Sequence, residues 1–155
     1  MQTVSESSTL EANKALLRRY KAGILNDRDI DALGEVASVD YLDHAALPGQ
    51  APGLEGLKER VAIIWRTFDP SWTIDEAIAE RDIVVLRWHL TGRHRRDFAG
   101  IPATGKPCVL RGIDIYRVRD GKMCEHWNVV DLYDLWRAST GDAVPPGGIE
   151  PPSSG

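Results

Sequence analysis

Four polar residues, three of them able to carry a proton, stand within or at the end of apolar runs near the carboxyl end of the chain. Asp114 lies between two isoleucines, and Asp131 follows two valines. His126 and Asn128 stand on either side of a tryptophan. Charged groups are disfavoured inside a buried strand unless they are paired or used. Because carboxylates and imidazole are the usual proton carriers of enzymes, we predict that these residues take part in acid–base catalysis.

The elements that must position these residues are two strand-like runs, Val109–Val118 and Met123–Val130. The turn between them contains Asp120 and Gly121. Aspartate and glycine tolerate the positive φ that a tight primed turn requires, so the two runs are predicted to pair as a β-hairpin. We expect this hairpin to form one wall of a pocket.

Helices are predicted in the first half of the chain, where apolar residues recur at helical spacing. They cover Leu10–Asn26, Ile30–Ala37 and Leu54–Phe68. Polar residues 1–9 are expected to be disordered. The segment Val39–His44 is predicted to be extended or irregular.

Strands are predicted in the second half, over Trp72–Glu80 and Asp82–Thr91. In the second of these the apolar residues alternate, which places Trp88 inward and Arg87 and His89 outward.

The order of helices followed by antiparallel strands is typical of the α+β class. We predict a single domain over residues 10–138, in which N-terminal helices pack on a strongly curved, mostly antiparallel sheet as a cone-shaped α+β barrel. The concave face of the sheet would be the pocket wall. Leu132–Ala138 would form a closing helix. Residues 139–155, rich in proline and glycine, are expected to be a disordered tail.

Composition excludes several classes of function. The chain has 155 residues, 43% of them hydrophobic, and a net charge of −4, which argues against a nucleic-acid partner. No run approaches the ~20 apolar residues that span a bilayer, so we predict no membrane partner. The N-terminus lacks the pattern of a secretory signal, and we expect a cytoplasmic protein.

The two cysteines, Cys108 and Cys124, lack the spacing of zinc ligands. We predict two buried thiols in a reducing compartment, although a cross-strand disulfide is compatible with the hairpin. The motifs of covalent hydrolases, phosphoryl-transfer enzymes, nicotinamide enzymes and zinc proteases are all missing. We therefore predict neither a metal nor a cofactor.

Three stretches resemble the SnoaL-like polyketide cyclases of the nuclear transport factor two-like superfamily. They are YLDH at 41–44, PGLEGLKERV at 52–61 and GRHRRDFAGIPATGKPCVLRGIDIYRVRDGKMCEHWNVVD at 92–131. The resemblance covers about residues 11–137 and implies the cone-shaped fold. That superfamily contains isomerases, dehydratases, hydrolases, cyclases and non-catalytic domains, so the fold alone does not give the reaction.

In the cyclases, as the resemblance implies, an aspartate on the last strand is the general acid/base of an intramolecular aldol condensation. A histidine on the preceding strand assists it, and the reaction needs no metal or cofactor. Matching through the shared DGK turn puts the aspartate position at Asn128 and the histidine position at Asp114. This chain departs from the family at both positions, and an amide cannot accept a proton from a carbon acid.

Asp114 is therefore the leading candidate for the base. A carboxylate desolvated in the pocket would have a raised pKa and could act near neutral pH. The competing interpretation is a structural ion pair with Arg87 or Arg111. Asn128 is predicted to line the pocket and to donate to a developing enolate or alkoxide, or to be a polar core residue.

His126 shares its strand face with Asn128 and is either a proton shuttle or a hydrogen-bonded core residue. Asp131 turns inward as a second carboxylate or caps the following helix, and we favour the cap. Aromatic and polar residues predicted to bind the substrate are Tyr20, Tyr41, His44, Trp65, Trp88 and Tyr116. His89 and His94 are expected to be exposed and receive no role.

These residues predict a small cofactor-independent enzyme that acts on a hydrophobic, polyketide-like or polycyclic carbonyl compound. The reaction would be a cyclisation or isomerisation, in the lyase or isomerase class. One alternative is epoxide opening by the paired carboxylates Asp114 and Asp131. Another is a non-catalytic module for hydrophobic-ligand binding or dimerisation. The apolar outer face, with Val109, Ile113 and Ile115, together with the habit of the family, predicts a homodimer.

Overall fold

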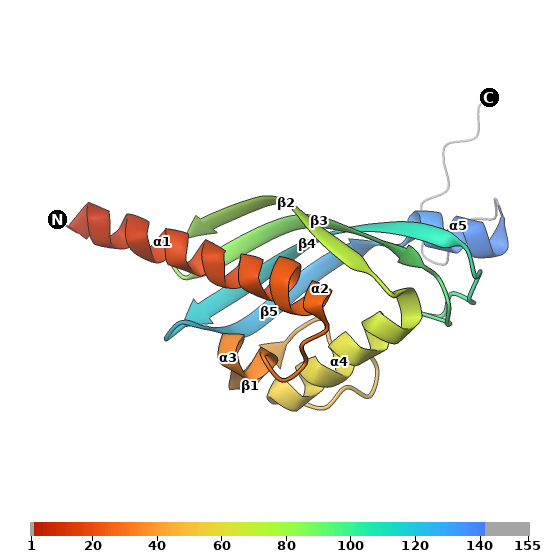
Figure 1. The fold of residues 1–155 in the computed structure, drawn as a ribbon, viewed down its shortest axis with the longest axis horizontal. Coiled ribbons are helices and arrows are strands. Elements are labelled where there is room, and N and C mark those ends of the chain that lie inside the picture. The colour runs from red at the N-terminus through yellow and green to blue at the C-terminus, as the bar shows by residue number, and fades with distance from the viewer. Residues whose placement is uncertain (1, 142–155) are drawn as a thin grey trace, which may run out of the picture.

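The computed structural model describes residues 2–141. The chain begins with a long helical arm composed of α1 (Gln2–Arg18), the π-helical turn η1 (Arg19–Ile24) and α2 (Leu25–Asp27), seen in Figure 1. The helix begins at Gln2, eight residues before the predicted start. Residues 5–9 are all exposed, so no apolar periodicity marked this part of the helix.

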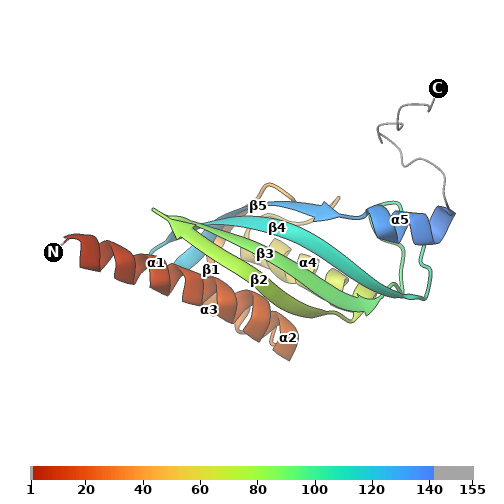
Figure 2. The same ribbon diagram turned by 90° about the horizontal axis from the view of Figure 1, so that it is seen from above.

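The short helix α3 (Leu33–Val36) leads into the edge strand β1 (Ala37–Asp43), and α4 (Gly53–Phe68) follows after a loop. Figure 2 shows α4 behind the strands and the helical arm running alongside β2. The predicted helix before residue 37 and the predicted helix ending at Phe68 are confirmed.

The sheet is formed mainly by two long hairpins. Its remaining strands are β2 (Ser71–Glu80), β3 (Ile83–Arg93), β4 (Pro107–Arg119) and β5 (Lys122–Asp131). The order is β1-β5-β4-β3-β2, with β1 parallel to β5 and all other neighbours antiparallel. The α+β class with helices packed on a mostly antiparallel sheet is confirmed. The sheet is open and mixed, with β1 and β2 as its two edges.

The turn between β4 and β5 has the predicted geometry. Asp120 has φ 51° and Gly121 has φ 73°, so both central residues adopt the left-handed conformation of a primed turn. This turn sets the pairing nearest to it, and a one-residue shift in register between Arg117 and Val118 then places Asp114 opposite Asn128 and Tyr116 opposite His126. The four residues therefore sit as neighbours on the inner face of the sheet.

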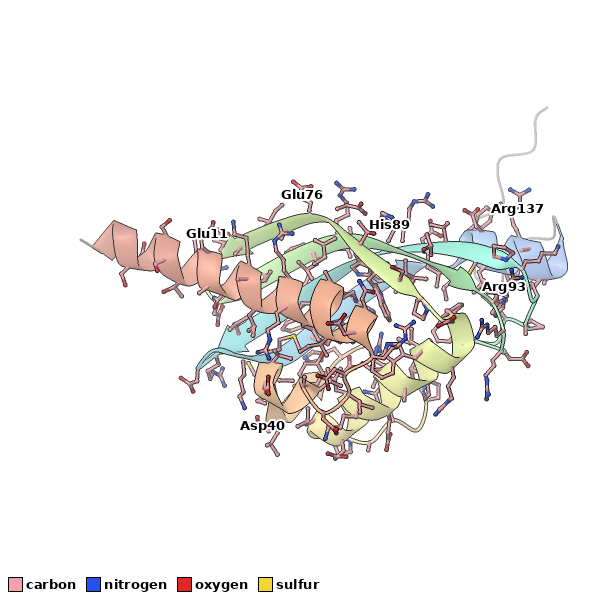
Figure 3. All side chains as sticks on the ribbon, in the orientation of Figure 1. Glu11, Asp40, Glu76, His89, Arg93 and Arg137 are labelled. Atoms are coloured by element: carbon pink, nitrogen blue, oxygen red, sulfur yellow. The ribbon has the colours of Figure 1, made fainter. Side chains whose placement is uncertain are left out.

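The core lies between this inner face and the helices. Trp88 is buried, whereas Arg87 is exposed, as the alternation predicted. His89 and Glu76 project from the opposite side of the sheet, which Figure 3 shows. A final helix, α5 (Tyr133–Thr140), extends two residues into the segment predicted to be a tail, and the rest of that segment, 142–155, lies outside the described residues. Within residues 2–141 no helix is long and apolar enough to cross a membrane.

Candidate functional site

A cavity of about 60 Å³ lies between the inner face of the sheet and the helices η1 and α4. That volume holds a few water molecules. Its apolar walls include Leu57, Phe68, Trp72, Trp88, Phe98 and Leu110. The polar side chains that reach it are Tyr20, Lys21, Tyr41, Arg60, Asp114, Tyr116, His126 and Asn128. Apolar walls with a few convergent polar groups are typical of a small-molecule site.

Asp114 is completely buried and is held by two donors. Lys21 Nζ lies 2.7 Å from Asp114 Oδ2, and the hydroxyl of Tyr116 donates to the same oxygen at 2.9 Å. Burial alone would raise the pKa of Asp114, but the Lys21 ammonium and the His126 imidazole hold it well below its usual range.

Two sequence predictions about Asp114 are therefore wrong. Its pKa is lowered and not raised, because a cation from a helix compensates for its desolvation. Its ion-pair partner is Lys21 and neither Arg87 nor Arg111, since both arginines lie on the outer face of the sheet. The distance of 93 residues between Lys21 and Asp114 hid this pairing from the sequence.

His126 stands between two carboxylates. Its Nδ1 lies 2.9 Å from Asp43 Oδ1 and its Nε2 lies 3.4 Å from Asp114 Oδ1. The ring is also stacked between Tyr41, at 6.3 Å between centroids, and Tyr116, at 4.7 Å. We refer to this arrangement as the Asp43–His126–Asp114 array.

Asp43 orients the imidazole. Burial acts to raise the pKa of Asp43, but the hydrogen bond and charge of His126, with help from Arg60 and Gln50, lower it to about 2. An ionised carboxylate can only accept hydrogen bonds. Nδ1 of His126 therefore carries a hydrogen atom and donates a hydrogen bond to Asp43. Nε2 is then the ring nitrogen that faces Asp114 and the cavity.

Two buried atoms of the array face each other. Asp114 Oδ1 and His126 Nε2 lie 3.4 Å apart, within reach of an ion pair, and neither makes a hydrogen bond of ordinary geometry to the described residues. Buried polar atoms without a full hydrogen bond are rare and often occur at functional sites.

Three tyrosines complete the polar wall. Burial, reinforced by the negative charge of Asp114, raises the pKa of Tyr20, Tyr41 and Tyr116. Their hydroxyls therefore remain protonated at neutral pH and can donate hydrogen bonds. Asn128 is half-buried, lines the cavity and lies opposite Asp114, as predicted.

Other predicted residues lie outside the cavity. Asp131 is exposed and accepts the backbone N–H of Tyr133 at 3.0 Å, so it supports the start of α5 and does not join Asp114. His44 is 39% exposed, bonds Glu125 and stacks on Trp127, because its side chain points to the opposite face from Asp43.

Two further placements differ from expectation. Trp65 donates to the carbonyl of Leu25 at 3.0 Å and is not part of the cavity wall. His94, predicted to be exposed, is fully buried and stacks on Phe68, since the loop after β3 folds back over α4. Of the predicted substrate-binding residues, those that line the cavity are Tyr20, Tyr41, Trp88 and Tyr116.

Sequence reasoning missed Lys21, Asp43 and Arg60. Signals for two of them were present in the chain. Lys21 lies four residues after Leu17, on the apolar stripe of the first helix. Asp43 lies two residues after Tyr41, and residues so spaced on a strand share a face.

The chain was compared with known proteins. A model described as SnoaL-like polyketide cyclase matches residues 14–139. TsrD from Streptomyces laurentii matches with a TM-score of 0.74 at 28% identity, over 84% of this chain and 96% of that one. A proposed polyketide cyclase from Acidithiobacillus ferrooxidans matches with a TM-score of 0.69 at 26% identity, over 83% and 96%. IdmH, a proposed polyketide cyclase from Streptomyces antibioticus, matches with 0.59 at 29% identity, over 71% and 86%.

No relative is found among the curated proteins. The family model extends from the first helix to α5 and so includes every residue of the cavity. This chain belongs to the SnoaL-like polyketide cyclase family.

Proposed function

We propose that this protein is a cofactor-independent enzyme that moves a proton next to the carbonyl of a hydrophobic, polyketide-like compound, so that the compound cyclises or isomerises. The observation that carries the proposal is the Asp43–His126–Asp114 array, in which the buried His126 Nε2 and Asp114 Oδ1 lie 3.4 Å apart and make no hydrogen bond of ordinary geometry to the described residues. Membership of a cyclase family supports the substrate class.

His126 is the base in this proposal. Its Nε2 takes a proton from the carbon beside the carbonyl, and the C–H electron pair becomes an enolate. The imidazolium that forms lies between two carboxylates, Asp43 and Asp114, which stabilise its charge. In a cyclisation the enolate carbon then attacks a second carbonyl, and the new alkoxide takes the proton back from Nε2. In an isomerisation the proton returns to another carbon.

Asp114, the base expected from the sequence, takes a different role. Its lowered pKa makes it a weaker base than a carboxylate that is only desolvated. We assign it the part of an anionic partner that holds His126 and accepts from Lys21 and Tyr116. Asn128, a neutral donor on the same wall, would bond the enolate oxygen.

The size of the cavity bears on the substrate. About 60 Å³ accommodates the reacting carbonyl end of a compound and is well below the ~300 Å³ of a typical ligand site. The rest of a polycyclic compound would extend beyond the enclosed space or displace side chains of its wall.

The test is exchange of protons beside a carbonyl into heavy water, followed by NMR over a panel of cyclic ketones and β-dicarbonyl compounds. His126→Gln should slow exchange by ~10²–10⁴, which is the usual contribution of a general base. His44→Gln removes a histidine outside the cavity and serves as the matched control, with an unchanged rate. An effect of less than a few-fold for His126→Gln would exclude it as the base. If compounds bind but the wild-type protein exchanges none of them, a binding module is the correct interpretation.

Epoxide opening is a second candidate because the array supplies two carboxylates on either side of a proton carrier. The two carboxylates are Asp43 and Asp114. Asp114 lines the cavity and Asp43 holds the far side of the His126 ring, whereas Asp131 contacts neither. Incubation with hydrophobic epoxides in ¹⁸O-labelled water distinguishes it, because hydrolysis would place the label in a diol.

We also propose that the protein forms a homodimer through the outer face of the sheet and acts in the cytoplasm. Val109, Ile113 and Val129 are exposed on that face, and the free thiols of Cys108 and Cys124 fit a reducing compartment. Val129→Asp should convert a dimer to a monomer in sedimentation at micromolar concentration. If the wild-type protein sediments as a monomer under the same conditions, the proposed dimer is wrong.

A further inference from the structure

Lys21 is a cavity residue that the acid–base mechanism uses only as a partner of Asp114. Its side chain is 8% exposed, and Nζ lies 2.7 Å from Asp114 Oδ2. Nζ also lies 4.4 Å from the centroid of the Trp88 ring and 5.7 Å from that of Trp72. The amine is thus enclosed by two aromatic faces and one carboxylate, at the wall of the cavity.

The π-helical turn brings Lys21 to this place. The backbone N–H of Leu25 bonds the carbonyl of Tyr20, five residues earlier, and this wider turn sets the side chains of Tyr20 and Lys21 next to each other on the cavity wall. Isolated π-turns within α-helices occur frequently at functional sites.

We infer that Lys21 is a nucleophile that forms an iminium bond with a small aldehyde or ketone held in the cavity. This covalent step is additional to the proton transfer under Proposed function, although it takes place in the same cavity. The reaction balances without any further reagent: the ammonium and the carbonyl give an iminium ion and one water molecule. The C=O bond breaks, the C=N bond forms, and two amine protons leave with the oxygen.

Charge favours this step. The ammonium and the iminium both carry one positive charge, so Asp114 serves as counter-ion before and after the reaction. The face of Trp88 stabilises either cation. Formation of the iminium therefore leaves no unpaired charge in the buried site.

Groups that could move the protons stand beside the amine. Lys21 must lose one proton before it attacks, and the intermediate carbinolamine must gain one to release water. Asp114 contacts Nζ directly, and His126 Nε2 lies 3.4 Å from the other oxygen of the same carboxylate, so a proton can pass between the amine and His126 by way of Asp114. Burial also lowers the pKa of Lys21, against the opposing effect of Asp114, which increases the fraction of neutral amine.

The ligand class follows from the cavity. A neutral carbonyl compound would leave the charges of the site balanced, and a volume of about 60 Å³ limits the enclosed part to a few heavy atoms. Short aldehydes and small ketones meet both conditions.

The experiment treats the full-length protein with propanal and sodium cyanoborohydride, which reduces an iminium to a stable secondary amine, and locates propylated lysines by peptide mass mapping. Lys58 is more exposed and pairs with Glu55 on the surface, so it is the internal reference. We expect Lys21 to be modified faster than the more exposed Lys58, because the cavity would hold propanal beside Lys21 Nζ and burial lowers the pKa of that amine.

Lys21→Arg retains the positive charge but cannot form the iminium, and Lys58→Arg is its matched control. Loss of the adduct in the first variant and its retention in the second support the inference. Modification of Lys21 no faster than that of Lys58 in the folded wild-type protein overturns it, and this comparison holds even if Lys21→Arg does not fold. Proton exchange without trapping at Lys21 would refute this inference alone, whereas trapping without exchange would refute the acid–base proposal alone.

Discussion

The indole of Trp88 lies directly against Gly112 on the neighbouring strand, in the position that a side chain at residue 112 would occupy. A Cβ atom built on Gly112 would come within 2.4 Å of Trp88 Cζ2. The glycine thus allows the indole to lie flat on the sheet, where its ring forms the wall beside Lys21. The shape of the cavity depends on this missing side chain.

Gly112→Ala should therefore destabilise the protein by about 1–3 kcal/mol, because the added methyl group overpacks a dense core. The free energy of unfolding in urea measures the effect, and tryptophan fluorescence reports the displaced indole. Gly23→Ala is the control, since a Cβ atom at Gly23 meets nothing within 4 Å. It should be neutral or stabilising, and equal losses in the two variants would contradict the prediction.

Removal of one member of the Lys21–Asp114 pair should lower the free energy of unfolding by about 3–5 kcal/mol, because the other charge would remain buried without this partner. The variants are Lys21→Met and Asp114→Leu. The double variant should lose less than the sum of the single losses, which a double-mutant cycle of unfolding free energies measures. Additive losses would show that the two charges are not coupled.

Asp43 should make stability depend on pH in the acid range. Its folded pKa of about 2 lies below the ordinary value of 3.8, so ionisation stabilises the folded protein. The contribution, about 2 kcal/mol, is complete above about pH 4 and is lost as the pH falls toward 2. Asp43→Asn should remove it, so that its unfolding free energy approaches that of the wild type as the pH falls from 5 to 2.5. A constant difference between the two proteins over that range would contradict the assignment.

The primed turn between β4 and β5 gives a fourth prediction. Gly121 has φ 73°, a conformation that alanine adopts poorly. Gly121→Ala should therefore lower the free energy of unfolding by about 1 kcal/mol. Asp120→Asn should have little effect, since asparagine tolerates the φ of 51° found there. Thermal unfolding of the two variants checks the contrast.

Local patterns predicted most of the fold because they depend on neighbours in the chain. The alternation around Trp88 placed Arg87 and His89 correctly, and the Asp120-Gly121 turn paired the last two strands. The parallel pairing of β1 with β5 was not predictable in this way, since it joins segments that lie far apart in the chain.

The candidate site was predicted for the hairpin residues Asp114, His126 and Asn128 and for part of the aromatic wall. The charged groups that set the chemistry of these hairpin residues come from elsewhere and were not predicted. Lys21 belongs to the first helix and Asp43 to the edge strand, and only the folded chain brings them to Asp114 and His126. The direction of the pKa shift of Asp114 was wrong for the same reason, because desolvation was considered without its distant cation.

The π-turn at Arg19–Ile24 acts as one surplus residue within an otherwise regular helix. Deletion of Gly23 would restore a continuous α-helix and rotate everything before it by about 100° relative to everything after it. Because α1 packs along β2, an arm that kept its place on the sheet would keep Lys21 with it and would instead turn Leu25 away from the cavity that it lines. The length of this one turn therefore sets the angle between the cavity residues that precede Gly23 and those that follow it, and removal of one residue would bring them out of register.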